Sequence, residues 1–502
     1  MSLLHELISS AAATAPSRPA LIAEDGSALS YAEFDHRIRC VAGWIAGRTE
    51  RGDRVAVIAD NSLAYAVLYY AVPLAGRVLT LINQRLGAAE QAAQLATARP
   101  ALVLGDEAYL WALPDITPAI EFGSADWRAA TRTTATAPEV ADADDPAWLL
   151  FTSGTTGVPK GVVHSHRSIA AAVRGTVEGR SAAPSGVYLL PFPMCHIAGY
   201  NMLVQHAVGA TVVLTPRFRP ESFAGLVRTH AVRSCSLAPT MLHALLAYLD
   251  RTGTSLPTLE SVAYGSAAMP LDLLRRAIET LGVDFHQGYG MTETGGNVTF
   301  LGPADDRAGA AGDPGVLASA GHPHSGVEIG IVDADGTPLP PGGTGEIVVR
   351  GEQVACGYWP DRPSTVDGWL RTGDIGRLDD TGRLFVVDRL KDIIVTGGEN
   401  VSSREVEDVL SVHPDVDMVA VVGVPDDYWG EAVCAVVVPV DGRHPHPDDL
   451  IGHVRSAIAA FKRPRAVLFV DELPLTGNGK IAKDRVRDLA RATLAGRKPP
   501  RV

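Results

Sequence analysis

The stretch Thr152–Gly161 reads TSGTTGVPKG, and it follows the apolar run Trp148–Phe151, which predicts a buried strand that opens into a loop. Glycines allow backbone N–H groups to turn toward a ligand, hydroxyl groups add donors, and Lys160 supplies a mobile positive charge. This composition suits a polyphosphate. A flexible glycine–serine turn has a similar composition, and the Gly-Lys-Ser/Thr ending of a Walker A loop is missing.

Helices and strands are predicted to alternate on both sides of this loop. A capping box at Ser30–Glu33 precedes apolar residues at helical spacing as far as Ile45. The apolar run Val55–Ile58 predicts a strand, and Asp60 or Asn61 is expected to cap the helix that follows. Similar short runs recur at Val212–Leu214, Ser234–Leu237 and Ser261–Tyr264. The alternation predicts an α/β fold with largely parallel, buried strands.

The pattern changes after Gly326. Turn signals at Asp335–Gly336 and Pro341–Gly343 separate short apolar runs and predict a β-rich subdomain over residues 326–388. Helix and strand signals then alternate again. The expected division is an N-terminal domain of α/β layers that includes this subdomain, a hinge, and a small mobile α+β C-terminal domain, at residues 1–388, 389–391 and 392–502.

The bulk composition excludes several classes of protein. The formal charge of −13 over 502 residues argues against a general nucleic-acid binder, which needs a broad basic surface. No window approaches the run of about 18 apolar residues that a membrane span requires. The five cysteines are scattered without a CxxC pair, which favours a reducing compartment. We therefore expect a cytoplasmic protein.

Five further motifs follow the glycine-rich loop in order. They are YGSAAMP at Tyr264–Pro270, QGYGMTET at Gln287–Thr294, WLRTGD at Trp369–Asp374, DRLKD at Asp388–Asp392 and LPLTGNGKI at Leu473–Ile481. Taken singly, these motifs are also compatible with a helix start, a turn aspartate, a surface ion pair or a solvent-facing lysine. The ordered set resembles the adenylate-forming superfamily of acyl-CoA synthetases, nonribosomal adenylation domains and luciferases, and acyl-CoA synthetases most of all.

The resemblance implies a role for particular residues. Those expected to bind ATP or AMP are Thr152, Ser153, Gly154, Thr155, Thr156, Gly265, Ser266, Ala267, Gln287, Gly288, Tyr289, Asp374 and Arg389. Those expected to be catalytic are Lys480, Glu293, Thr292 and Lys160, with Glu293 also a ligand of Mg²⁺. The acid is expected to contact His196, Tyr200, Tyr264, Gly290 and Met291. CoA is assigned to Gly397 and Gly398, and the hinge to Lys391.

These roles predict a reaction in two steps with Mg²⁺, ATP and CoA. A carboxylate is a poor acyl donor, so its oxygen is first joined to AMP and pyrophosphate leaves, in a step that depends on positioning and charge stabilisation. A thiol then displaces AMP. Magnesium often takes a single protein carboxylate when phosphates complete its shell, which fits Glu293. No dedicated base for the thiol is evident; His196 is a candidate by residue type, but its position in the motif indicates a gate beside the acid and thiol channels.

The acid is expected to be neutral beyond its reacting carboxylate. The residues that the resemblance places around it include no charged side chain, and a malonate-like acid would need an arginine there. Ile197–Gly199 lacks the aspartate that anchors the ammonium of an amino acid, and an unpaired buried ammonium would be costly. Medium-chain, branched and aromatic monocarboxylic acids remain. Free CoA is the favoured acceptor, and the alternatives are an acyl carrier protein, a luciferase-like oxygenase or a nucleotide-binding regulator.

Three positions depart from the pattern of the superfamily. Asp388 stands where many relatives have glycine, Ser403 where many have proline, and Cys195 where an aromatic residue is common. The last change predicts an altered entrance to the acid pocket. Neither of the first two changes removes a charged catalytic group.

Overall fold

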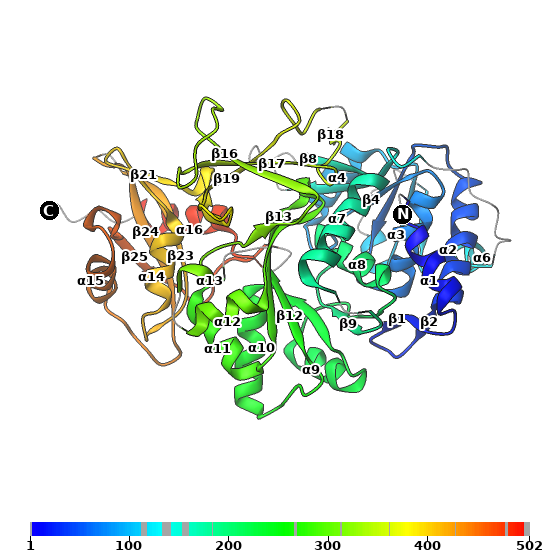
Figure 1. Ribbon diagram of the computed structural model, residues 1–502, viewed down its shortest axis with the longest axis horizontal. Coiled ribbons are helices and arrows are strands. Elements are labelled where there is room, and N and C mark those ends of the chain that lie inside the picture. The colour runs from blue at the N-terminus through cyan, green and yellow to red at the C-terminus, as the bar shows by residue number, and fades with distance from the viewer. Residues whose placement is uncertain are drawn as a thin grey trace.

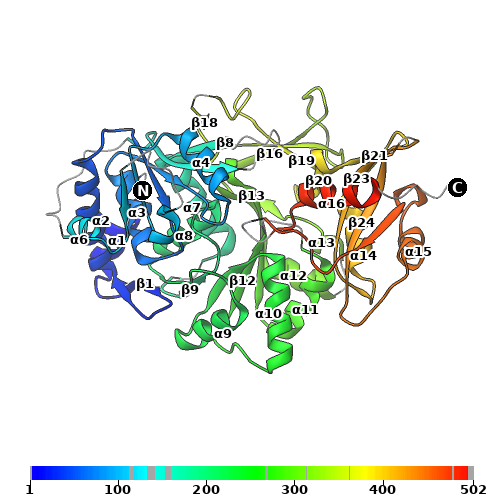
Figure 2. The ribbon, with the colours of Figure 1, turned by 180° about the vertical axis from the view of Figure 1, so that it is seen from behind.

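A computed structural model describes the structure of residues 3–111, 118–132, 142–152, 160–182, 184–265, 269–311, 314–360, 362–426, 428–476 and 480–495. The N-terminal and C-terminal parts of the chain lie at opposite ends of the long axis of the molecule (Figure 1). Seen from behind, strand β13 (Asp284–Met291) again lies between them (Figure 2).

One α/β layer is built on the sheet of order β18-β8-β7-β4-β3-β5-β6. Its strands are β3 (Arg54–Ile58), β4 (Val78–Leu81), β5 (Leu102–Gly105), β6 (Ala119–Glu121), β7 (Pro146–Thr152), β8 (Lys160–Ser165) and β18 (Gly357–Trp359). The four strands β7, β4, β3 and β5 pair in parallel, whereas β8 runs back along β7. The predicted strand before the glycine-rich loop is therefore confirmed as β7.

A second layer has the order β15-β14-β13-β12-β11-β9-β10-β1-β2. Its other strands are β1 (Pro19–Ala23), β2 (Ala28–Ser30), β9 (Val187–Leu190), β10 (Thr211–Leu214), β11 (Ser234–Leu237), β12 (Ser261–Gly265), β14 (Gly296–Leu301) and β15 (His322–Pro323). Strands β9 to β13 pair in parallel, as the short buried apolar runs predicted. One apolar core extends through both layers.

The β-rich region forms an antiparallel sheet of order β16-β17-β19-β20. Its strands are β16 (Val327–Val332), β17 (Gly345–Gly351), β19 (Leu370–Leu378) and β20 (Leu384–Arg389). Gly336 lies in the predicted turn with a φ of 87°, where glycine avoids the strain that a side chain would cause. This sheet has an apolar core of its own.

The C-terminal part of the chain is a small α+β unit. Its sheet has the order β22-β21-β24-β23, with β25 beside β24. The strands are β21 (Ile394–Thr396), β22 (Glu399–Val401), β23 (Val416–Asp426), β24 (Gly430–Pro439) and β25 (Ala466–Phe469). An apolar cluster lies on each face of this sheet, and both clusters are distinct from the larger core of the N-terminal layers.

The helices cover these sheets. Those before β13 are α1 (Glu6–Thr14), α2 (Tyr31–Ala46), α3 (Leu63–Leu74), α4 (Ala88–Ala98), α5 (Glu107–Leu110), α6 (Ala125–Ala130), α7 (His166–Arg180), α8 (Asn201–Ala207), α9 (Pro220–Thr229), α10 (Pro239–Thr252) and α11 (Leu271–Leu281). The later ones are α12 (Pro303–Ala311), α13 (Pro314–Leu317), α14 (Ser403–Ser411), α15 (Pro447–Ala457) and α16 (Lys483–Ala495). Short 3₁₀ turns lie at Ile197–Tyr200, Thr292–Thr294, Leu390–Asp392 and Ala460–Lys462.

The helix caps confirm one prediction and correct another. Ser30 and Glu33 form the predicted capping box of α2. The cap of α3 is Ser62, whose hydroxyl accepts from Tyr65 N, and not Asp60 or Asn61 as predicted. Asn61 is buried and its amide bonds distant backbone groups, so it is unavailable as a cap. Among the described residues, no helix has the length and apolar character needed to cross a bilayer.

Candidate active site

The carboxyl ends of β12 and β13 form the floor of the site. Tyr264 pairs with Gln287 and Gly265 with Gly288 across the parallel register. A Cβ atom on Gly265 would clash with the carbonyl of Gly288, and one on Gly288 would clash with Asn297. Glycine is therefore needed at 265 and 288 for strand packing.

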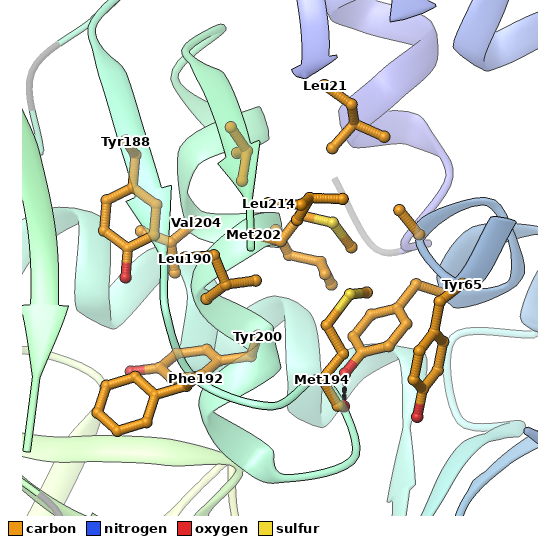
Figure 3. Close-up of a cluster of buried hydrophobic side chains, with 14 of the residues drawn as sticks. Leu21, Tyr65, Tyr188, Leu190, Phe192, Met194, Tyr200, Met202, Val204 and Leu214 are labelled. Carbon is orange, nitrogen blue, oxygen red and sulfur yellow. Dashed lines mark hydrogen bonds between the residues drawn. The ribbon is translucent and has the colours of Figure 1, made fainter. Parts of the chain in front are cut away.

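A small cavity of about 50 Å³ adjoins this edge, between β11 to β13 and the segment that leads into α8. Among the residues predicted to contact the acid, those that line it are Tyr200, Tyr264, Gly290 and Met291. Figure 3 shows Tyr188, Phe192 and Tyr200 in the adjoining apolar cluster. The structure thus brings four of the five predicted acid-binding residues together.

His196, the fifth, is not among the residues that line the cavity. Its Nε2 is buried without a hydrogen-bond partner among the described residues. Burial, with smaller contributions from Lys480 and Arg85, lowers the pKa of His196 to about 3. A neutral imidazole with so low a pKa is a weak base for a thiol while Lys480 lies nearby.

Arg180 lines the same cavity, and the sequence reasoning missed it. It is the last residue of α7, and its Nη1 donates to Asn201 Oδ1 at 2.7 Å and to Ser236 Oγ at 3.5 Å. The predicted list of pocket residues, which contained no charged side chain, therefore omitted one. No local signal separates Arg180 from an ordinary basic residue at a helix end, since only the tertiary fold brings it to β11.

Asp374, Arg389 and Tyr289 form a polar corner beside this cavity. Asp374 and Arg389 face each other across β19 and β20 and form an ion pair of 3.3 Å. The Tyr289 hydroxyl donates to Asp374 Oδ2 at 2.8 Å. Burial raises the pKa of Asp374, while Arg389 opposes the rise. A buried carboxylate beside fixed donors can accept hydrogen bonds from vicinal hydroxyl groups.

Lys480 reaches the same corner from the C-terminal unit. Its backbone is anchored by a pair of bonds with Thr476, from Thr476 N to Lys480 O at 2.7 Å and from Lys480 N to Thr476 Oγ1 at 3.1 Å. Burial lowers the pKa of Lys480 to about 8, with Arg389 adding to the fall and Asp374 opposing it. The structure thus places this amine in the electrostatic field of the Asp374 corner and of His196.

A second polar cluster, with Glu293 at its centre, lies where the glycine-rich loop ends. Lys160, the first residue of β8, has its ammonium 5.9 Å from the Tyr358 ring centre. The Tyr358 hydroxyl donates to Glu293 Oε1 at 3.3 Å. Burial raises the pKa of Glu293, and Arg389 and Lys160 oppose this rise. His164 Nε2 contacts the Thr292 carbonyl at 2.7 Å and supports the turn that carries Glu293.

Some predicted nucleotide-binding residues are not described. Thr152 pairs with Lys160 at the base of the loop. The residues outside the described ranges are Ser153, Gly154, Thr155, Thr156, Ser266 and Ala267. Gln287 is described, and its Oε1 accepts a long hydrogen bond of 3.5 Å from the Tyr264 hydroxyl.

The surroundings of Glu293 fit a divalent cation that is shared with phosphates. In the described part of the chain, no group of three or more His, Cys, Asp or Glu side chains could hold a metal ion. Glu293 is a buried carboxylate whose Oε1 accepts a long hydrogen bond from Tyr358. A cation there would offset the cost of burying its charge, and nucleotide oxygens would have to supply most of the remaining ligands.

The residues assigned to CoA and to the hinge lie in the C-terminal unit or at its border. Gly397 and Gly398 form the turn between β21 and β22, with φ of 62° and 85°. Gly397 N donates to Trp429 O at 2.8 Å. Lys391 lies in the 3₁₀ turn after β20, and its Nζ pairs with Asp484 at 3.3 Å.

Comparisons with known proteins point to one family. The model of a family described as AMP-binding enzyme matches residues 8–359, and that of the AMP-binding enzyme C-terminal domain matches residues 405–480. A feruloyl-CoA synthase of Amycolatopsis sp is 36% identical over 477 residues, which cover 92% of this chain and 94% of that protein. The fatty acid–[acyl-carrier-protein] ligase ScoC of Streptomyces coeruleorubidus is 33% identical over 94% of this chain and 93% of its own length.

A solved structure is similar over almost the whole chain. The amide bond synthetase McbA from Marinactinospora thermotolerans matches with a TM-score of 0.87 and 32% identity. The match covers 97% of this chain and 99% of that one.

Proposed function

Because this chain belongs to the AMP-binding enzyme family, we propose that it is an ATP-dependent acyl-CoA synthetase for a carboxylic acid that is neutral beyond its reacting carboxylate. The predicted resemblance to the adenylate-forming superfamily is confirmed by the two family matches, as is the α/β fold class by the similar solved structure. The names of the relatives support the thioester product, since a feruloyl-CoA synthase matches over most of both chains.

The observation that carries this proposal is the position of Lys480. Its amine is close enough for its pKa to be shifted by the charges of Asp374 and Arg389, and its own charge lowers the pKa of His196. The Asp374 corner suits the ribose of a nucleotide, and the cavity next to His196 suits the acid. A cation that is near both would stabilise the α-phosphate as the carboxylate attacks it.

In the first half-reaction, a carboxylate oxygen of the acid bonds to the α-phosphorus of ATP, and the bond to the leaving pyrophosphate breaks. Lys480 stabilises the charge that develops on the α-phosphate. Lys160, at the end of the glycine-rich loop, would bind the β- and γ-phosphates, and Glu293, in the turn after β13, would hold Mg²⁺. The bound cation supplies charge neutralisation, and the chain supplies alignment.

In the second half-reaction, the sulfur of CoA bonds to the acyl carbon, AMP leaves and the thiol proton is released. Lys480 serves only the first half-reaction, so the C-terminal domain is proposed to rotate about Lys391 and withdraw it before the thiol attacks. The same rotation would bring the turn at Gly397 and Gly398 to the site. The proposed domains are residues 1–388 and 392–502, joined at 389–391.

The test is pyrophosphate release from ATP across a panel of carboxylic acids, with thioester formation measured for CoA. Neutral monocarboxylic acids should support release, and CoA should yield the acyl thioester. The similarity to ScoC makes an acyl carrier protein the second acceptor to assay, with hydroxylamine as a trap for the adenylate. Release of pyrophosphate without a thioester on CoA would exclude CoA as the acceptor, and absence of release with every acid would exclude the proposed function.

A further inference from the structure

Arg180 brings a positive charge to the cavity that the acid is proposed to occupy. The side chain is half-buried and lines the cavity together with Ser236 and Asn201. No carboxylate of the described residues lies within 4.0 Å of its guanidinium nitrogens. A cation in such a place normally has a partner, because the loss of hydration must be offset.

Arg180 is held in place by neutral groups. Asn201 Oδ1 accepts from Nη1 at 2.7 Å, while Asn201 Nδ2 donates to Ala198 O at 2.8 Å, so the orientation of the amide is determined. Ser236 Oγ accepts from Nη1 at 3.5 Å. A guanidinium has five N–H groups, and those two bonds use only Nη1. The Nε group of Arg180 is buried and has no hydrogen-bond partner in the described structure.

Two groups beside Arg180 add a further donor and supply no negative charge. The Tyr188 hydroxyl donates to Ser236 Oγ at 2.8 Å, so the Ser236 hydroxyl accepts from both neighbours and its own proton is available to a ligand. Burial lowers the pKa of His286 to about 4, and the charge of Arg180 adds to this effect. His286 is therefore neutral and supplies no counter-charge.

The position of Ser236 and Arg180 along the sheet is far from the reacting carboxylate. Ser236 pairs with Ala263, and the Gly265–Gly288 pair lies two residues further toward the carboxyl edge. At about 3.3 Å per residue, the Ser236 row is roughly 7 Å deeper than that pair. Lys480 and Glu293 lie beyond the edge, so Arg180 faces the distal end of a bound acid.

We infer that the acid carries an oxygen acceptor at its distal end, and that this oxygen binds Arg180 and Ser236. This inference rests on the proposed function and deepens it, because it names the substrate class. A hydroxyl, methoxy or keto oxygen satisfies the donors and keeps the acid neutral beyond its reacting carboxylate. A second carboxylate has the same acceptor chemistry, and the experiment distinguishes the two. Arg180 is thus a specificity-determining residue.

The experiment compares matched acids on the full-length protein. Each pair shares one skeleton, such as cinnamate with 4-hydroxycinnamate and octanoate with 8-hydroxyoctanoate, and 4-carboxycinnamate provides the charged arm. The readout is kcat/KM for pyrophosphate release. At least one oxygenated acid should exceed its unsubstituted partner by about tenfold to a hundredfold, the range for a hydrogen bond from a charged donor.

The variants assign that preference to the guanidinium. Arg180→Met should reduce the ratio within the preferred pair to near one, and Arg180→Lys should restore part of it. Arg174→Met is the control, because Arg174 lies on the same helix but pairs with Glu352 at 3.0 Å on the surface, and it should preserve the ratio. Thermal unfolding of each variant shows whether a loss of the kcat/KM ratio reflects loss of the fold. If Arg180→Met does not fold, the kcat/KM ratio in Arg180→Lys tests the role of the guanidinium.

The outcomes separate the two proposals. Pyrophosphate release that favours the unsubstituted acid in every pair, or a preference that survives in Arg180→Met, overturns the role of Arg180 alone. A preference for 4-carboxycinnamate that depends on Arg180 supports the distal acceptor but overturns the neutral acid. The absence of release with any acid overturns the proposed function and this inference with it.

Discussion

The Ser403 hydroxyl donates to Asp388 Oδ2 at 2.8 Å, so two positions that depart from the pattern of the superfamily contact each other. Asp388 lies on β20, and Ser403 begins α14. Ser402 Oγ and Arg404 N also donate to the same carboxylate oxygen, at 3.1 and 3.3 Å. These bonds connect the two sides of the proposed hinge in the arrangement that holds Lys480 at the site.

The first prediction concerns this contact. Asp388→Ala should weaken the arrangement that forms the adenylate, because a carboxylate at the start of α14 accepts several donors. We expect the rate of pyrophosphate release to fall several-fold, while conversion of supplied acyl-AMP and CoA stays equal or rises. Ser403→Ala should act in the same direction, and Ser456→Ala, on α15, is the control. Equal losses in both half-reactions would contradict a role in domain position.

The second prediction separates Lys480 from Lys391. Lys480→Ala should reduce adenylate formation by about a hundredfold or more, because a charge partner of the transition state is lost, and should still convert supplied acyl-AMP. Lys391→Pro should do the reverse, because proline fixes φ and blocks the backbone rotation. Lys462→Ala, which removes a lysine paired with Glu405, is the control. Folded variants that lose both steps equally would exclude two working conformations.

The third prediction is a pH dependence. The pKa of Lys480 is lowered to about 8, mainly by burial, so its amine is charged below that pH and neutral above it. Only the charged amine stabilises the α-phosphate, so kcat/KM for adenylate formation should fall as the pH rises through about 8. Lys480→Arg retains its charge, and its residual activity should lack this fall. A fall at the same pH in both proteins would assign the titration to another group.

The fourth prediction tests the polar corner. Asp374→Asn keeps the size of the side chain and removes its charge, so ATP should bind more weakly by about 1 to 3 kcal/mol, measured through KM for ATP. Tyr289→Phe removes the hydroxyl that donates to Asp374 at 2.8 Å but leaves the carboxylate, so its effect through this contact should be smaller. An unchanged KM for ATP in Asp374→Asn would remove this residue from the nucleotide site.

The fifth prediction concerns Asn61 as a structural link. Its Nδ2 donates to Phe192 O at 2.8 Å and to Thr215 O at 3.1 Å, and its Oδ1 accepts from Met194 N at 2.8 Å. Asn61→Ala should lower the stability of the N-terminal domain by about 1 to 3 kcal/mol, seen as a lower Tm. Asn83→Ala, which loses a local bond to Arg85 N, should cost less. An equal fall in Tm for the two variants would show that the long-range bonds of Asn61 add no more stability than the local bond of Asn83.

Features that depend on neighbouring residues and on periodicity could be predicted from the amino-acid sequence. The capping box of Ser30 and Glu33 joins residues three apart, and the short apolar runs became the parallel strands β10, β11 and β12. Such features are visible locally because one turn of helix or one buried strand is specified within a few residues. The ordered motifs identified the family for a related reason, since each is a continuous stretch.

Contacts between groups that are far apart in the sequence depend on the tertiary fold. Arg180 bonds Ser236 across 56 residues, and Asn61 bonds Met194 across 133, where the sequence predicted a neutral pocket lining and a helix cap. Asp388 and Ser403 depart from the pattern of the superfamily at separate positions in the sequence, and they form a hydrogen bond in the fold. Such contacts depend on how sheets and domains pack, which no local pattern encodes, so the sequence could not show that Arg180, at the end of α7, meets Ser236 and brings a positive charge to the cavity.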